Sequence, residues 1–111
     1  MIEDRRALDD IDGIAAAEGV DALFLGRGDL GLSLGNAAAP VPALKDVVEH
    51  IVEVAKAHGK PVSAVVQSMR SDEAKWLIDL GVTAMMVASD LGFLRQAAKG
   101  ALEDFRELMA P

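Results

Sequence analysis

Three short segments of the chain are apolar and lack the polar alternation of a half-exposed strand. Continuous apolar runs of this length are typical of strands that are buried on both faces, as in a parallel sheet. The runs are Ala22–Leu25, Val62–Val66 and Ala84–Ala88, and the opening Met1–Glu3 is interpreted as the stub of an earlier strand. Each run follows a glycine that can end a helix and precedes an aspartate that can start one, namely Gly19 and Asp29, Gly59 and Asp72, and Gly81 and Asp90.

Between these runs the apolar residues recur at helical spacing. The pattern predicts helices over Ala7–Ala17, Pro42–His58, Ser71–Leu80 and Leu91–Met109, with a loop at Gly35–Pro42. The expected buried stripe of the second helix is Leu44, Val47, Val48, Ile51, Val54 and Ala55. Because right-handed crossovers align strands that alternate with helices, we expect a parallel α/β sheet with helices outside. A doubly wound sheet and part of a barrel both satisfy this pattern.

Composition narrows the function classes. The 111 residues suffice for one domain with a core, but a closed (β/α)8 barrel usually takes about 250. The 11 basic and 18 acidic residues give a net charge of −7, which argues against nucleic acid and membrane partners. The chain has no cysteine, and its acidic start has no apolar core typical of a signal peptide. We therefore expect a soluble, cytoplasmic protein without a structural zinc site.

Two carboxylates lie at or after the ends of predicted strands, at the sheet edge where α/β proteins usually place their active sites. Asp29 follows the loop Gly26-Arg27-Gly28, and Glu3 ends the strand stub one strand–helix step earlier. If their strands are parallel neighbours, both side chains emerge at the carboxyl edge of the sheet, where a hard divalent cation could bridge them. The structural alternatives are that Asp29 caps a short helix over Leu30–Leu34 and that Glu3 belongs to a solvated charge cluster.

Other polar and apolar residues have simpler expected roles. Arg27 could pair with an anionic substrate or with Asp21, and an exposed arginine of a loop is more often only a solvated charge. Asp90 is expected to cap the last helix. Met85 and Met86 are interpreted as core residues of the third apolar run.

The stretch IEDRRALDDIDGIAAAEGVDALFLGRGDLGLSLG resembles the HpcH/HpaI aldolase/citrate lyase family of the phosphoenolpyruvate/pyruvate barrel superfamily. Family members have Ile-Glu at the end of the fifth barrel strand, then a sixth strand ending in Gly-x-x-Asp-Leu, and then Ser-Leu-Gly. The spacing of their two metal-binding carboxylates matches Glu3 and Asp29. The resemblance implies an α/β fold that is the C-terminal half of a (β/α)8 TIM barrel, from the end of strand 5 through helix 8. Residues 1–111 are then one partial barrel domain.

The resemblance also implies a chemistry. It assigns Glu3 and Asp29 as ligands of Mg²⁺ or Mn²⁺, and Gly26, Gly28 and Asp29 as contacts of a pyruvate-like 2-oxo acid. The implied activity is that of a class II aldolase, a metal-dependent carbon–carbon lyase that acts through a pyruvate enolate. The general base and the arginine anchor of the family come from the first half of the barrel, so no catalytic residue is assigned here.

Alternatives stay open at this point. A half-barrel leaves two sheet edges and its inner face uncovered, which predicts a homo-oligomer or a partner chain that supplies the other half. The chain could act as a citrate or malyl-CoA lyase-like enzyme, or as a non-catalytic module for assembly or metal binding. A flavodoxin-like domain whose carboxylates are helix caps is a further alternative.

Overall fold

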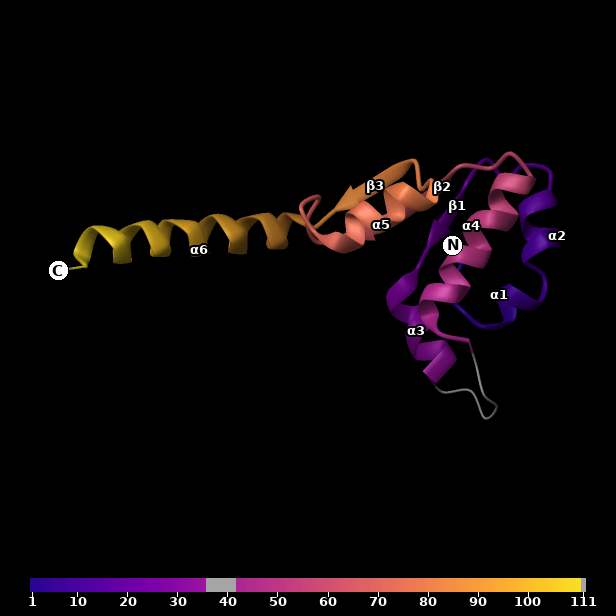
Figure 1. Cartoon of the computed structure of the whole chain (residues 1–111), viewed down its shortest axis with the longest axis horizontal. Helices are drawn as coiled ribbons and strands as arrows, with labels where there is room; N and C mark the ends of the chain where they lie inside the picture. The colour runs from indigo at the N-terminus through magenta and orange to yellow at the C-terminus, as the bar shows by residue number, and fades with distance from the viewer. Residues whose placement is uncertain (36–41, 111) are drawn as a thin grey trace.

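The chain folds into one parallel sheet with helices packed on one face and a last helix that extends away from it (Figure 1). A computed structural model describes residues 1–35 and 42–110. Within these residues the strands are β1 (Leu23–Leu25), β2 (Val62–Val66) and β3 (Ala84–Val87), in that order across the sheet. The helices are α1 (Arg6–Asp9), α2 (Ile11–Ala16), α3 (Arg27–Gly35), α4 (Leu44–Ala57), α5 (Asp72–Leu80) and α6 (Asp90–Met109). The predicted α/β order is confirmed.

The two faces of the sheet differ in what covers them. Leu23 pairs with Val62, and Ala64 pairs with Met85, in parallel register. Because side chains alternate along a strand, register partners share a face. The face toward the helices carries the buried residues Leu23, Leu25, Val62, Ala64 and Val66. The opposite face carries Phe24, Ser63, Val65, Ala84 and Met86, and none of these is buried.

The open face corrects one expectation and confirms another. Met86 is 57% exposed, so the prediction that it is a core residue is wrong, as is the prediction that the strands are buried on both faces. The physical reason is that the helices cover one face of the sheet only. The uncovered inner face expected of a half-barrel is present.

The hydrophobic core lies between the sheet and the helices α2, α3, α4 and α5, and α3 contributes Leu30 and Leu34. α4 contributes Val47, Val48, Ile51, Val52, Val54 and Ala55, as predicted except that Val52 joins the stripe and Leu44 is half-buried. α2 adds Ile11 and Ala15, and α5 adds Ala74 and Leu77. Each fully buried valine, leucine or isoleucine stabilises the fold by about 1.5–3 kcal/mol relative to an exposed one.

The three glycines predicted to end helices have the expected backbone, whereas the aspartate predicted to cap α6 does not cap it. Gly19, Gly59 and Gly81 have φ of 84°, 66° and 99°, which residues with a Cβ rarely adopt. The prediction that Asp90 caps α6 is wrong. The hydroxyl of the preceding Ser89 accepts the N–H of Gly92 at 3.1 Å and therefore takes that role.

The first predicted helix, Ala7–Ala17, is broken into α1 and α2. The break lies at Asp10, whose φ of −130° and ψ of 27° are not helical. Aspartate is a weak helix former because its side chain competes for nearby backbone groups. Gly35 ends α3, and residues 36–41 of the predicted loop Gly35–Pro42 lie outside the described residues.

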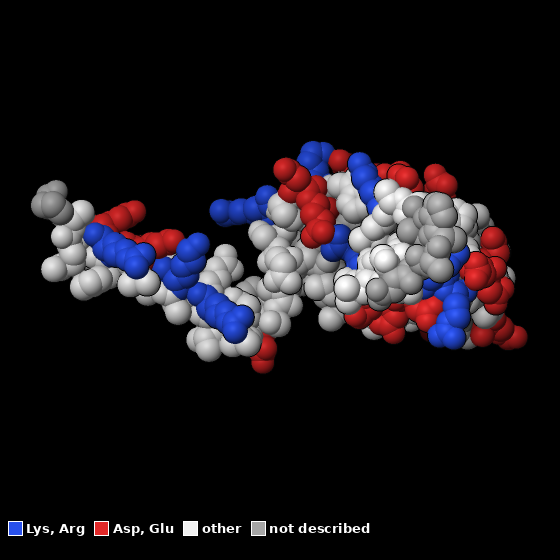
Figure 2. Space-filling view, turned by 90° about the horizontal axis from the view of Figure 1, so that it is seen from below, with Lys and Arg blue, Asp and Glu red and all other residues white. Residues whose placement is uncertain are grey.

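α6 extends away from the rest of the molecule and accounts for its elongated shape of 62 × 33 × 22 Å (Figure 1). None of its residues is buried, and its exposed apolar side chains include Phe93, Leu94, Leu102, Phe105 and Leu108. Figure 2 shows lysine and arginine side chains spaced along α6, with uncharged residues beside them. In the part of the chain that the structure describes, no helix combines the length and apolarity that crossing a membrane requires.

Candidate metal and substrate site

The first residues of the chain run beside the carboxyl end of β1. The N–H of Ile2 donates to the carbonyl of Phe24 at 2.7 Å, and the N–H of Gly26 donates to the carbonyl of Ile2 at 2.9 Å. Ile2 also forms a parallel bridge with Leu25, as expected for the stub of a preceding strand. Glu3 therefore leaves the sheet at the same edge as Gly26.

Gly26 leaves room for the side chain of Glu3. A Cβ placed on Gly26 would lie 2.6 Å from the Cβ of Glu3 and 3.3 Å from its Oε2. Any larger residue at position 26 would therefore displace Glu3. The side chain of Glu3 passes close to the backbone of residue 26 and is exposed to solvent.

Asp29 lies in the first turn of α3, directly after β1. The N–H of Leu30 donates to the carbonyl of Gly26 at 2.9 Å. The N–H groups of residues 27–29 precede this first helical bond and have no acceptor within α3. The alternative that Asp29 caps a helix over Leu30–Leu34 is wrong, because the helix begins earlier, at Arg27.

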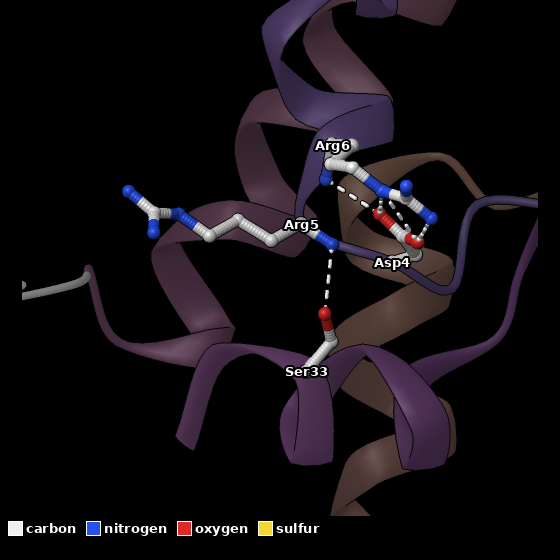
Figure 3. Close-up of polar contacts among 4 residues, drawn as sticks. All are labelled: Asp4, Arg5, Arg6 and Ser33. Carbon is white, nitrogen blue, oxygen red and sulfur yellow. Dashed lines mark hydrogen bonds and ion pairs between the residues drawn. The ribbon is translucent and has the colours of Figure 1, made fainter. Parts of the chain in front are cut away.

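A hydrogen bond holds the segment after Glu3 against α3. The backbone N–H of Arg5 donates to the Oγ of Ser33 at 3.0 Å (Figure 3). Ser33 lies one helical turn after Asp29 on α3. The contact therefore joins the two segments that carry the candidate carboxylates.

The neighbouring carboxylate, that of Asp4, forms an ion pair with Arg6. The Nη2 of Arg6 lies 2.8 Å from the Oδ2 of Asp4, and the N–H of Arg6 also donates to Asp4 (Figure 3). The hydrogen bonds from Arg6 lower the pKa of Asp4 below its ordinary value, and the same contact raises the pKa of Arg6. Asp4 therefore stays ionised and engaged with Arg6, beside Glu3.

Two adjoining hollows receive the candidate residues. One of about 420 Å³ is lined by Gly26, Gly28 and Asp29 with Val65 and Gln67 from the end of β2. The second, of about 510 Å³, contains Glu3, and Met1 lines both hollows. The structure thus places Gly26, Gly28 and Asp29 in one hollow, and Glu3 at its border against Gly26.

Arg27 does not make the expected contact with Asp21. Its Nη1 lies 2.5 Å from the Oε1 of Glu73, in the first turn of α5, and its Nη2 donates to the carbonyl of Val65 at 2.5 Å. The pairing of strands β1 and β2 puts these acceptors beside residue 27. The predicted pairing with Asp21 is therefore wrong, and the anionic partner of Arg27 is a residue of the chain itself.

A model of the HpcH/HpaI aldolase/citrate lyase family matches residues 1–97. The chain belongs to this family. The match confirms the resemblance read from the sequence, and it excludes an unrelated flavodoxin-like domain.

Relatives of this HpcH/HpaI chain include enzymes with a named activity. The 5-keto-4-deoxy-D-glucarate aldolase of Enterobacter sp. (strain 638) is 37% identical over 108 residues, which are 96% of this chain and 41% of the relative. The aldolase of the same name from Escherichia coli O6:H1 matches with the same identity and coverage. The chain thus spans about two fifths of the length of these relatives.

Solved structures of family members have a fold similar to that of this chain. A family protein from Burkholderia cenocepacia J2315 superposes with a TM-score of 0.79 at 28% identity, over 95% of this chain and 40% of that chain. The citrate synthase SbnG superposes with a TM-score of 0.72 at 32% identity, over 96% of this chain and 44% of that chain. This HpcH/HpaI chain therefore has the fold of a half-barrel of the TIM-barrel aldolases.

The donor set of the HpcH/HpaI chain fits a hard divalent cation. Glu3 and Asp29 offer exposed carboxylate oxygens at one edge of the sheet, and Mg²⁺ and Mn²⁺ prefer oxygen ligands. Among residues 1–35 and 42–110, no group of three or more histidine, aspartate or glutamate residues is arranged to hold a metal. A cation held by this pair would need water or substrate oxygens to complete its coordination.

Sequence reasoning missed three residues of this edge. Ser33 belongs to the Ser-Leu-Gly motif, but its contact with Arg5 depends on how α3 packs. Glu73 and Gln67 follow β2, and only the strand pairing brings them to the end of β1. Gln67 directly follows the predicted strand, which was its one sequence signal, and Glu73 lies in the first turn of the next helix.

Proposed function

We propose that this chain supplies the metal-binding half of a class II aldolase that acts on 2-oxo acids through a pyruvate enolate. The observation that carries the proposal is the placement of Glu3 against Gly26, at the edge where α3 begins with Asp29 in its first turn. The family supports it, since its members are generally class II aldolases that depend on a divalent metal.

In this proposal Glu3 and Asp29 hold Mg²⁺ or Mn²⁺, and Gly26, Gly28 and Asp29 line the place of the substrate. A bound divalent cation supplies Lewis-acid polarisation of the 2-oxo acid. The N–H of Gly26 donates to the carbonyl of Ile2 and is therefore not free to bind the substrate. Gly26 instead leaves room for the side chain of Glu3, because it has no Cβ. The N–H of Gly28 lies in the first turn of α3 and suits a substrate carboxylate, which the helix dipole also favours.

The proposal includes an assembly. Residues 1–111 form one partial barrel domain, and either a second copy or a partner chain covers the open sheet face. Support comes from the exposed side chain of Met86 and the half-buried side chains of Phe24 and Val65 on this face, and from the unburied apolar residues of α6. Large exposed apolar surfaces of this kind mark sites of association. A cytoplasmic location remains a prediction of the composition.

The test is metal-dependent cleavage of 5-keto-4-deoxy-D-glucarate, the substrate named for the relatives. Pyruvate release by the purified chain is followed with Mg²⁺ or Mn²⁺, against metal-only and EDTA controls. Turnover that disappears in Asp29→Asn and persists in Asp46→Asn supports the proposal. Asp46 is the matched control because it is the third residue of α4, as Asp29 is of α3.

Absence of turnover has a defined meaning. If the chain binds Mn²⁺ through Glu3 and Asp29 without cleavage, it is a metal-binding half-barrel whose base and anchor come from another chain. If it neither binds metal nor cleaves the substrate, the aldolase proposal fails. A non-catalytic module for assembly then becomes the function to test.

A further inference from the structure

The side chain of Arg27 joins three segments that are far apart in the sequence. It begins on the residue between Gly26 and Gly28, contacts the carbonyl of Val65 near the end of β2, and ends on Glu73 in α5. Its side chain is 15% exposed, whereas that of Glu73 is 47% exposed. An arginine enclosed to this degree is not a solvated surface charge.

The geometry of these contacts suits a guanidinium. Two of its nitrogens meet two acceptors at the same distance of 2.5 Å, one charged and one neutral. The planar fork of arginine presents several N–H groups in fixed directions, whereas a lysine ammonium is a single point charge on a flexible stem. Arg27 therefore fixes the start of α3 against both β2 and α5.

We propose that Arg27 is a positioning residue of this site, held by Glu73 and Val65, and that it sets where Asp29 lies relative to Glu3. The inference rests on the proposed metal-binding role of Asp29. Arg27 lines the same hollow as Gly28 and Asp29, and its guanidinium is engaged by Glu73 and by the carbonyl of Val65. It acts through the backbone of residues 26–29, which it anchors to the end of the neighbouring strand.

A purely electrostatic role of Arg27 and a positioning role predict opposite effects of its removal on cation binding, so the two can be distinguished by experiment. Arg27 lies two residues before Asp29 and carries a positive charge that repels a cation. Removing that charge would strengthen cation binding if the guanidinium acted only through its field. If Arg27 positions the turn, its removal weakens cation binding.

The first measurement is amide hydrogen exchange by NMR in the full chain, comparing wild type with Arg27→Met. The reporters are the N–H groups of Gly26 and Leu30, which donate to Ile2 and Gly26. We expect both amides to exchange about tenfold faster in the variant, because local opening exposes them. The control Lys75→Met breaks the Lys75–Asp79 ion pair on the exposed face of α5 and leaves both amides unchanged. Unchanged exchange in Arg27→Met overturns the proposal whether or not the chain binds metal.

The second measurement is a Mn²⁺ titration followed by electron paramagnetic resonance. Arg27→Met is expected to weaken binding about tenfold, as is typical of partners that orient metal ligands. Arg27→Lys keeps the charge and is expected to recover only a small part of the loss. Glu73→Gln weakens binding as well, and the double variant is no worse than Arg27→Met because the two residues act as one unit.

The outcomes separate this inference from the proposed function. Tighter Mn²⁺ binding in Arg27→Met overturns positioning and leaves the metal site intact. Faster exchange at Gly26 and Leu30 with no Mn²⁺ binding by the wild type leaves the anchoring role of Arg27 in place and contradicts the metal-binding role of Asp29.

Discussion

The side chain of Glu3 lies in the space that a side chain on Gly26 would fill. Glu3 directly follows the bridge residue Ile2 and Gly26 directly follows β1, and the hydrogen bonds of Ile2 with Phe24 and Gly26 bring the two together. The absence of a Cβ at position 26 thus allows a carboxylate to cross the end of β1. This relationship ties a glycine of the loop to a candidate metal ligand.

Gly26→Ala is expected to displace Glu3 and loosen the first strand segment. A Cβ at 2.6 Å from that of Glu3 forces a backbone shift, which lowers the free energy of unfolding by about 1–3 kcal/mol. Urea unfolding followed by circular dichroism measures the loss. Gly28→Ala is the control, since a Cβ at position 28 meets no atom within 4 Å. Equal stabilities of the two variants would contradict the crowding at Gly26.

Ser33→Ala is expected to weaken the contact between the segment of Glu3 and α3. It removes the acceptor of the Arg5 N–H, which lowers the free energy of unfolding by about 1 kcal/mol. The Mn²⁺ affinity is expected to fall as well, because the two carboxylates are no longer held together. Ser71→Ala is the control: it removes the cap of α5 and destabilises the chain by about 1 kcal/mol without changing the affinity. An equal loss of affinity in both variants would show a general effect of stability.

Arg6→Met is expected to raise the pKa of Asp4 toward its ordinary value of 3.8. The contact with Arg6 favours the ionised carboxylate, so its stabilisation is present above pH 3.8 and is lost as the pH falls through the lowered pKa. An NMR titration of the Asp4 carboxyl carbon measures the shift. Arg5→Met is the control because the Arg5 side chain points away from Asp4 (Figure 3). If Arg6→Met leaves this titration unchanged, the pairing is absent in solution.

Phe105→Glu is expected to reduce self-association of the chain. Phe105 is an exposed apolar residue of α6, and covering such a side chain contributes about 1.5–3 kcal/mol. Light scattering coupled to gel filtration measures the mass of wild type and variant. Gln96→Glu adds the same charge to an exposed position of the helix and is expected to keep the wild-type mass. A wild-type monomer would contradict assembly through a second copy and leave a separate partner chain to cover α6.

The sequence predicted the order of the elements well because local signals define it. The apolar runs predicted β2 at its observed bounds and the other two strands to within one residue. The glycines and the helical spacing of apolar residues marked where the helices lie between them. The break at Asp10 and the caps at Ser71 and Ser89 depend on side-chain competition over one or two residues, which periodicity does not resolve.

The candidate site was predictable only in part. The carboxylates Glu3 and Asp29 were identified because strand ends on one edge carry chemistry in parallel sheets. The partner of Arg27 was not, since Glu73 reaches it only through the pairing of β1 with β2. The exposure of Met86 likewise depends on which face the helices cover, and an apolar run does not encode that.

The most direct test of the metal site is a Mn²⁺ titration of four proteins: wild type, Glu3→Gln, Asp29→Asn and the control Asp46→Asn. Free Mn²⁺ is measured by electron paramagnetic resonance, in the full chain and in whatever oligomer it forms. We predict that Glu3→Gln and Asp29→Asn each weaken binding by at least about tenfold, the loss typical even of residues that support metal ligands. Asp46→Asn is predicted to bind as the wild type does. Equal affinities in all four proteins would contradict the assignment of Glu3 and Asp29 as a metal site.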